Sequence, residues 1–261
     1  MILAAPFISK KLIDADATAF VAASGATDFD AINRFVIGIK TLGLYNSMVC
    51  WPLRSTQNAG TGSTAYSLGG LGTYNGTLVN GPTWGTDGVN FNGTSTYIRN
   101  ASLFDNAQGT LAAFAFTNNP IIAGDGRRLI NFDQGIELGA TNSTPNIGIE
   151  AYYAATPFDG VGRNVNPSTS ISGVRFGAFG VFSNNQSVAR YINNGSKLIN
   201  SGVTTTYTSR QSVTIGGRAA QLFWDGSISF ATYSTARFTD AQVSDFYTLY
   251  KQTLGQGLGL P

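Results

Sequence analysis

The sequence predicts a mostly β protein built as a sandwich of two antiparallel sheets. From Val49 onward, short apolar or alternating runs are separated by turn residues, mostly at intervals of about 8 to 12 residues. Only 11% of the 261 residues are charged, whereas 43% are hydrophobic and 32 are glycine. Because a chain of this length buries roughly three quarters of its unfolded surface, this composition indicates one large, turn-rich β domain with its own core.

The expected strands are the runs that lie between these turns. They cover residues 49–53, 76–80, 88–91, 96–99, 109–117, 128–132, 136–138, 147–153, 173–182, 187–192, 197–200, 212–215 and 227–233. Pro52 lacks a backbone donor, so the first strand is expected at a sheet edge. Residues 193–196 predict a hairpin, and so do residues 225–226. In the last strand, Ile228 and Phe230 are expected to share one buried face.

The first 46 residues differ from the rest because they carry helical patterns. Residues 13–23 are rich in alanine and have acidic residues at their start, which suits the N-terminal end of a helix dipole. Residues 28–42 repeat apolar side chains at helical spacing. Neither helix has enough apolar area to stand alone, so both are expected to dock on the following domain or to anchor the protein in an assembly. The chain is therefore divided into a helical N-terminal anchoring segment, residues 1–46, and a β-sandwich, residues 47–261.

One more helix is expected near the C-terminus. It begins at Thr239, which can form a capping box with Gln242. Its apolar side chains recur on one face, at Val243, Phe246, Tyr247, Tyr250 and Leu254. The middle of the chain has no helical crossovers, and this excludes a doubly wound α/β fold.

Composition excludes several kinds of partner. The basic residues are scattered, with a net charge of +2, and form no stripe that neutralises several phosphates, so no nucleic-acid partner is expected. No apolar run approaches the roughly 18 residues of a membrane span, so no membrane insertion is expected. The N-terminal residues lack the basic start and long apolar core of a secretory signal, which predicts synthesis in a cytoplasm. Cys50, the single cysteine, is expected to be a small buried hydrophobe.

Catalytic chemistry has few candidates in this sequence. There is no histidine, which removes Ser–His and Cys–His nucleophile pairs and every histidine-containing metal site. A glycoside hydrolase needs two carboxylates about 5 to 10 Å apart. The only glutamates, Glu137 and Glu150, belong to separate expected strands, where they either face each other or point to solvent. We expect no catalytic residue and no enzymatic activity.

The ligand-binding candidates are aromatic residues near polar loops, because sugars bind exposed aromatic rings. Tyr152, Tyr153 and Trp224 are these candidates, although Trp224 also closes an apolar run and is therefore expected in the core. Asp225 is the one candidate cation ligand, with a turn-forming role as the alternative. The aspartates are dispersed without EF-hand-like spacing, so residue spacing alone predicts no metal site and no cofactor.

Several segments, taken in order, are similar to a known β-sandwich family. They are Trp51-Pro52-Leu53 and residues 74–84 (YNGTLVNGPTW), 88–98 (GVNFNGTSTYI), 190–202 (RYINNGSKLINSG) and 213–243. Over residues 47–250 they resemble the laminin-G-like branch of the concanavalin A-like lectin/glucanase superfamily. The resemblance implies a concanavalin A-like jelly-roll β-sandwich, in which calcium is the one common cofactor.

Two departures from that superfamily bear on activity. Its hydrolase branch carries the motif Glu-x-Asp-x-x-Glu on one strand, and this chain has no such motif. Ser229 stands in the neighbourhood where the laminin-G-like branch often has an acidic residue. Both departures favour a protein without catalytic activity.

Residues 43–48 (GLYNSM) are similar to a segment that precedes such domains in tailed-bacteriophage virion proteins. This resemblance implies a non-enzymatic structural component of a virion, such as a fibre, decoration or tail-associated protein, made in the host cytoplasm and located in the virion. Its partners would be other virion proteins, bound through the N-terminal segment, and further copies of itself, with a trimer expected for a fibre. The alternatives are a carbohydrate-binding host-recognition module for a surface glycan and, third, a glycoside hydrolase.

Overall fold

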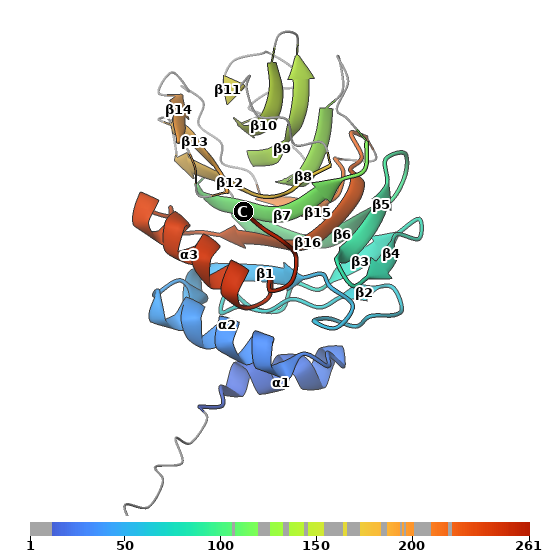
Figure 1. The fold of residues 1–261 in the computed structure, drawn as a ribbon, viewed down its shortest axis with the longest axis vertical. Coiled ribbons are helices and arrows are strands. Elements are labelled where there is room, and N and C mark those ends of the chain that lie inside the picture. Colours follow the sequence, from blue (N-terminus) through green and yellow to red (C-terminus); the bar gives the residue numbers. More distant parts are fainter. Residues whose placement is uncertain are drawn as a thin grey trace, which may run out of the picture.

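The chain folds into three layers, which are two β-sheets packed face to face and a set of helices on the outside of one sheet (Figure 1). The computed structural model describes residues 12–105, 108–119, 126–132, 136–143, 146–153, 164–165, 173–183, 187–193, 195, 197–200, 210–218 and 221–261. All the described strand pairings are antiparallel. The predicted mostly β sandwich, with short N-terminal helices and one C-terminal helix, is confirmed.

We name the two sheets A and B. Sheet A has the strand order β14-β13-β12-β7-β16-β5-β4, and β1 also pairs with β16. Its strands are β1 (Met48–Pro52), β4 (Thr83–Gly85), β5 (Gly88–Asn92), β7 (Gly109–Thr117), β12 (Arg175–Ser183), β13 (Ser187–Ile192), β14 (Leu198–Asn200) and β16 (Asp225–Ser234). Sheet B has the order β11-β10-β9-β8-β15-β6-β3-β2. Its strands are β2 (Thr64–Ala65), β3 (Gly76–Val79), β6 (Tyr97–Asp105), β8 (Gly126–Phe132), β9 (Ile136–Ser143), β10 (Asn146–Tyr153), β11 (Asn164–Val165) and β15 (Arg210–Ile215).

Most of these strands coincide with runs expected from the sequence. The strands β2, β4 and β11 are not expected, because two or three residues show no periodicity. The hairpin at residues 193–196 is confirmed, since β13 and β14 pair on either side of it. Pro52 lies in β1, which pairs with β16 and is also bridged to Leu68 through Cys50, so this expected edge is partly covered by the loop after β2.

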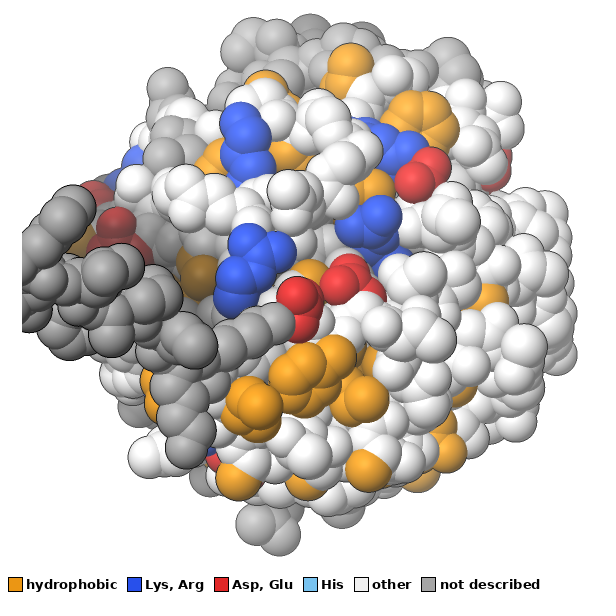
Figure 2. Space-filling model, turned by 60° about the horizontal axis from the view of Figure 1, so that its bottom comes forward, with side chains coloured by type: hydrophobic (Ala, Val, Ile, Leu, Met, Phe, Trp, Pro, Cys, Tyr) orange, Lys and Arg blue, Asp and Glu red, His pale blue; other side chains and the backbone are white. Residues whose placement is uncertain are grey.

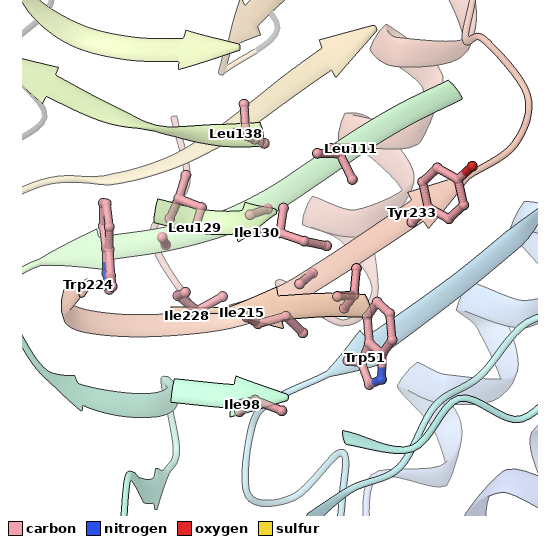
Figure 3. Close-up of a cluster of buried hydrophobic side chains, with 14 of the residues drawn as sticks. Trp51, Ile98, Leu111, Leu129, Ile130, Leu138, Ile215, Trp224, Ile228 and Tyr233 are labelled. Carbon is pink, nitrogen blue, oxygen red and sulfur yellow. The ribbon is translucent and has the colours of Figure 1, made fainter. Parts of the chain in front are cut away.

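Apolar side chains from both sheets fill the space between them (Figure 3). The labelled side chains come from strands of sheet A and sheet B and from the segment before β16: Trp51, Ile98, Leu111, Leu129, Ile130, Leu138, Ile215, Trp224, Ile228 and Tyr233. Phe132 and Tyr233 meet edge to face with ring centroids 4.8 Å apart. Such pairs add to the stability that burial alone provides.

The helical layer consists of α1 (Ala15–Ser24), α2 (Phe29–Thr41) and α3 (Asp240–Gln252), with the short helix η1 (Tyr45–Ser47) before β1. Asp14 and Asp28 cap α1 and α2 through their side chains. The predicted capping box of Thr239 and Gln242 begins α3. None of the described helices combines the length and the apolar character that a membrane crossing demands.

A second core lies between sheet A and the helices. Phe230 of β16 packs edge-on against Phe35 of α2, with ring centroids 5.5 Å apart, and lies 6.0 Å from Phe246 of α3. The buried residues of α1 and α2 belong to this core. The two N-terminal helices therefore dock on the sandwich, as one of the two interpretations predicts. An anchoring role for residues 1–46, and a domain boundary after them, stay predictions.

The alternating sequence pattern predicts one buried face for the central strand β16. In the structure, this strand is buried on both faces. A β-bulge interrupts its register with β7 between Ile228 and Phe230. Ile228 belongs to the core between the sheets, whereas Phe230 belongs to the core under the helices. The expectation that these two side chains share a face is wrong, because the bulge shifts the pleat by one residue at Ser229.

The hairpin predicted at residues 225–226 is also wrong. Asp225 is the first residue of β16, and its backbone pairs with Asn92 of β5. Gly226 has a φ of +138°, and a Cβ at this position would lie 2.1 Å from the carbonyl oxygen of Phe116. This glycine is needed for the close approach of β16 to β7 and not for a turn.

We expect Phe35→Ala to lower the free energy of unfolding by about 3–5 kcal/mol, because it opens a cavity in the core between α2 and sheet A. Ile37→Ala is the control on the same helix, since Ile37 is only partly buried, and it is expected to cost about 1 kcal/mol or less. Urea denaturation followed by tryptophan fluorescence measures both. Equal costs would show that α2 does not carry the packing described above.

Candidate functional site

A cavity of about 350 Å³ lies where three segments, distant in sequence, meet beside Asp225. Its size falls at the lower end of the range typical of small-ligand sites. The lining residues come from the end of β5 and the loop after it, from the start of β8, and from the segment that enters β16. They are Asn92, Gly93, Thr94, Gly126, Arg127, Leu222, Phe223 and Asp225.

Asp225 supplies the carboxylate of this cavity. The side-chain amide of Asn119 donates to its Oδ2, and the side-chain amide of Asn118 approaches Oδ1 at 3.4 Å. The backbone of Asp225 is fixed as well, because it pairs with Asn92 in the β5–β16 ladder. These contacts hold the Asp225 carboxylate in one orientation, and the side chain is partly exposed.

The loop after β5 is shaped by one asparagine side chain. Oδ1 of Asn92 accepts the backbone N–H groups of Thr94, Ser95 and Thr96, at 2.9–3.1 Å. Gly93 has a φ of +73°, and a Cβ there would lie 2.9 Å from Cβ of Asp225. The loop backbone thus comes close to Asp225 without any side chain between them.

A guanidinium group and an aromatic ring complete the cavity. Arg127 donates through Nη1 to Oγ1 of Thr117 at 3.2 Å and to the carbonyl oxygen of Asn119 at 3.3 Å. The Phe223 ring is partly exposed and lies against Tyr97, with centroids 6.1 Å apart. The cavity therefore joins an oriented hydrogen-bond acceptor, an oriented donor and an apolar ring, which is the combination that recognises hydroxyl-rich ligands.

The structure places Trp224 in the core. Its side chain is fully buried, and Nε1 donates to the carbonyl oxygen of Phe116 at 3.0 Å. The indole ring also meets Phe176 edge to face at 6.0 Å. Figure 3 shows it among the side chains between the sheets. Trp224 therefore anchors this segment in the core, while its sequence neighbours Phe223 and Asp225 line the cavity.

The other candidates from the sequence lie elsewhere. Tyr152 and Tyr153 belong to β10, on the opposite sheet from Asp225, and their side chains lie outside the described part of the structure. In the described part of the chain, no three His, Cys, Asp or Glu side chains gather in a way that could hold a metal. Among the described residues that line the cavity, Asp225 supplies the one carboxylate and Arg127 the one guanidinium. This setting suits a hydroxyl ligand better than a calcium ion, which takes six to eight oxygen ligands.

Glu137 is fully buried and held by two arginines. Nε of Arg128 lies 2.6 Å from its Oε2, and Nε of Arg218 lies 3.0 Å from its Oε1. The register pairs Glu137 with Tyr152, and it pairs Glu150 with Gly139, two residues further along β9. Of the two arrangements considered from the sequence, the solvent-facing one is wrong for Glu137, because its side chain is 0% exposed. The Glu150 side chain lies outside the described part of the structure.

Sequence reasoning identified Asp225 but missed the residues around it. Arg127 and Phe223 were not singled out, because a pair of arginines and a short apolar run carry no specific local signal for a binding site. The segments meet through the pairing of β5 with β16, the hydrogen bond from the Gly93 backbone to the carbonyl of Trp224, and that from the Arg128 backbone to the carbonyl of Leu222. No spacing within the chain predicts these contacts.

Comparison with known proteins identifies the fold but no family. No model of a known family matches the chain, and no curated protein does. A Trypanosoma rangeli sialidase mutant that displays trans-sialidase activity is 12% identical with a TM-score of 0.60, over 92% of this chain and 39% of that chain. Trypanosoma rangeli sialidase in complex with sialic acid is 14% identical with a TM-score of 0.54, over 79% of this chain and 33% of that one. The botulinum neurotoxin serotype D binding domain is 10% identical with a TM-score of 0.55, over 79% and 52%.

The likeness shows the fold. The chain spans about a third of the length of the sialidase chains and about half of the toxin domain chain. The two-sheet sandwich implied by the resemblance to the concanavalin A-like superfamily is consistent with these neighbours. The laminin-G-like branch and the phage origin stay predictions.

We expect Glu137→Gln to lower the free energy of unfolding by about 3–5 kcal/mol, because it leaves buried guanidinium groups beside a neutral side chain. The ion pair of Arg175 and Asp87, also 2.6 Å long, is the matched control, since the Asp87 side chain is 51% exposed. Asp87→Asn is expected to cost about 1 kcal/mol or less. Urea titrations measure the free energy of unfolding of both variants. A Glu137→Gln variant as stable as the parent would refute a structural role for this buried ion pair.

Proposed function

We propose that this chain is a carbohydrate-binding β-sandwich module without enzymatic activity, and that it binds sugar in the cavity beside Asp225. The observation that carries the proposal is the combination of an oriented carboxylate, a guanidinium and a partly exposed ring in one small cavity. A carboxylate accepts hydrogen bonds from sugar hydroxyls, and Arg127 donates to their oxygens. The Phe223 ring offers an apolar face to the C–H groups of a pyranose.

The structural neighbours support a sugar as the first ligand class to test. One of them is a sialidase with sialic acid bound, and the other is the binding domain of a neurotoxin. They share with this chain the sandwich fold, at 10–14% identity, and nothing closer. The argument for sugar binding here therefore depends on the cavity and not on these names.

The positions of the described carboxylates favour a protein that binds sugar without hydrolysing it. Glycoside hydrolysis needs a pair of carboxyl groups on either side of the scissile bond. Asp225 is the one carboxylate among the described residues that line its cavity. Glu137 is engaged by Arg128 and Arg218 and is shielded from solvent. A carboxylate held in this way is a poor proton donor to a substrate.

The virion role expected from the sequence is a second proposal, and the N-terminal surface favours it. Leu12 and Ile13, just before α1, are adjacent large apolar side chains that are 69% and 62% exposed. We propose that this surface attaches the module to other proteins of a phage virion, as the resemblance of residues 43–48 implies. Self-association is proposed with it, as a trimer if the particle component is a fibre.

We expect the parent protein to bind a subset of sugars on a glycan array, tested with and without calcium. Asp225→Ala and Phe223→Ala are each expected to weaken that binding by about tenfold or more, equivalent to about 1.4 kcal/mol. Asp87→Ala removes an exposed carboxylate elsewhere and is expected to change nothing. An array on which the parent binds no glycan would overturn the proposal, as would sugar hydrolysis that Glu150→Gln abolishes.

The attachment surface is tested in assembled particles. Replacing Leu12 and Ile13 together by aspartate is expected to prevent incorporation of the chain into virions, because charges replace the exposed apolar contact. Circular dichroism is expected to stay that of the parent, since both side chains are exposed in the folded chain. Thr41→Asp, on the exposed face of α2, is the control. Normal incorporation of the double variant would exclude this surface as the attachment site.

A further inference from the structure

A second cavity, of about 570 Å³, lies between α1 and the loop that follows β2. Its lining residues are Asp16, Ala19, Phe20, Ala23, Tyr45, Asn46, Tyr66, Ser67, Leu68, Gly69, Gly70, Gly72, Thr73 and Asn75. We call it the α1 groove. Figure 2 brings the side of the molecule with α1 forward, where hydrophobic side chains gather beside acidic and basic ones on a surface that is otherwise mostly uncharged.

The floor of the α1 groove is glycine backbone. A Cβ on Gly69 would lie 2.2 Å from the carbonyl oxygen of Met48, and one on Gly70 would lie 2.7 Å from Cα of Asn46. The loop is also hydrogen-bonded to β1, because Leu68 and Cys50 exchange two backbone hydrogen bonds of 2.8 Å. The glycines thus let this loop pack directly against the backbone at residues 46 and 48, which fixes the floor in position.

Helix α1 forms one wall of the groove and is anchored in the core. Ala19 and Ala23 line the groove one turn apart, and both are exposed. Phe20 lies between them in sequence and is 5% exposed, so it fixes the helix to the core. The small alanine side chains leave the groove open along α1.

Several polar side chains line the α1 groove. The side chains of Asn46, Tyr66 and Thr73 line the groove and make no hydrogen bond to any described residue. The Oδ1 atom of Asn75 accepts the backbone N–H and the hydroxyl of Ser67, which orients that amide at the rim. An amide and two hydroxyls are therefore available to a ligand, next to two tyrosine rings.

At the end of the groove, one ammonium group is shared by two carboxylates. Nζ of Lys40 lies 2.7 Å from a carboxylate oxygen of Asp14 and 2.6 Å from one of Asp16. The same ammonium group sits 4.7 Å above the ring of Tyr45. Burial and the nearby Asp16 raise the pKa of the Tyr45 phenol, so this hydroxyl keeps its proton. Because two carboxylates engage Lys40, this ammonium group is a poor partner for an anionic ligand.

We propose that the α1 groove is a second binding site and that it takes a neutral oligosaccharide. Flat glycine backbone, tyrosine rings and neutral hydrogen-bonding groups match the mixed apolar and hydroxyl surface of such a chain. An apolar peptide is the rival ligand. It is less favoured because it would leave the amide and hydroxyl groups of the groove without partners. This site does not depend on the Asp225 cavity, and either can bind without the other.

The test uses the full chain, isotopically labelled, and nuclear magnetic resonance with millimolar maltotriose, cellotriose, mannotriose and galactotriose. At least one of these is expected to shift the backbone resonances of residues 66–75. Ala23→Arg blocks the groove and is expected to weaken that binding by about tenfold or more, while Asn46→Ala weakens it severalfold. Ala22→Arg is the matched control, because Ala22 is exposed on α1 but does not line the groove, and its effect is expected to stay within about twofold.

The two sites are separated by their variants. Asp225→Ala is expected to leave the shifts of residues 66–75 unchanged, so failure of the first site says nothing against the second. Trigalacturonic acid and an uncharged apolar hexapeptide complete the set of ligands. The proposal is overturned if no neutral trisaccharide shifts residues 66–75, if Ala22→Arg weakens binding as much as Ala23→Arg, or if the charged sugar or the peptide binds more tightly.

Discussion

The structure depends on one strand that is buried on both faces. β16 lies between two cores and pairs with β1, β5 and β7. On one face Ile228 and Ala231 contact the side chains of sheet B, and on the other face Phe230 meets the helices. The bulge at Ser229 makes this possible, and the Ser229 hydroxyl bonds to the carbonyl of Phe114 and to the Tyr250 hydroxyl. A buried polar residue is tolerated there because its hydrogen bonds are satisfied.

Much of the fold could be predicted because its signals are local. A capping box such as that of Thr239 and Gln242 involves residues three apart, and strand alternation repeats every second residue. The bulge in β16 has no such signal, because it exists only in relation to the register of β7. For the same reason Gly226 was taken for a turn residue, although its carbonyl neighbour, Phe116, lies 110 positions earlier in the chain.

The candidate site could be predicted only in part. Asp225 was predicted only as a candidate cation ligand or turn residue, and strand pairing brings Arg127 and Phe223 to the same cavity. Trp224 shows how a local pattern supports two interpretations, since a bulky residue beside an acid fits both a binding site and a core. The Trp224 side chain is fully buried, which assigns it to the core. The α1 groove has a local signal in its glycines, yet its wall belongs to a helix about fifty residues earlier.

The pairing of β1 with β16 has a consequence for synthesis. Met48 is aligned with Ser234, and α2 packs on Phe246 near the other end of the chain. As the chain leaves the ribosome, the apolar face of α2 meets Phe246, and β1 meets β16, only after these later segments have been made. Contacts this distant in sequence form slowly. Until then an apolar helix face and one edge of β1 stay exposed, and such surfaces favour aggregation.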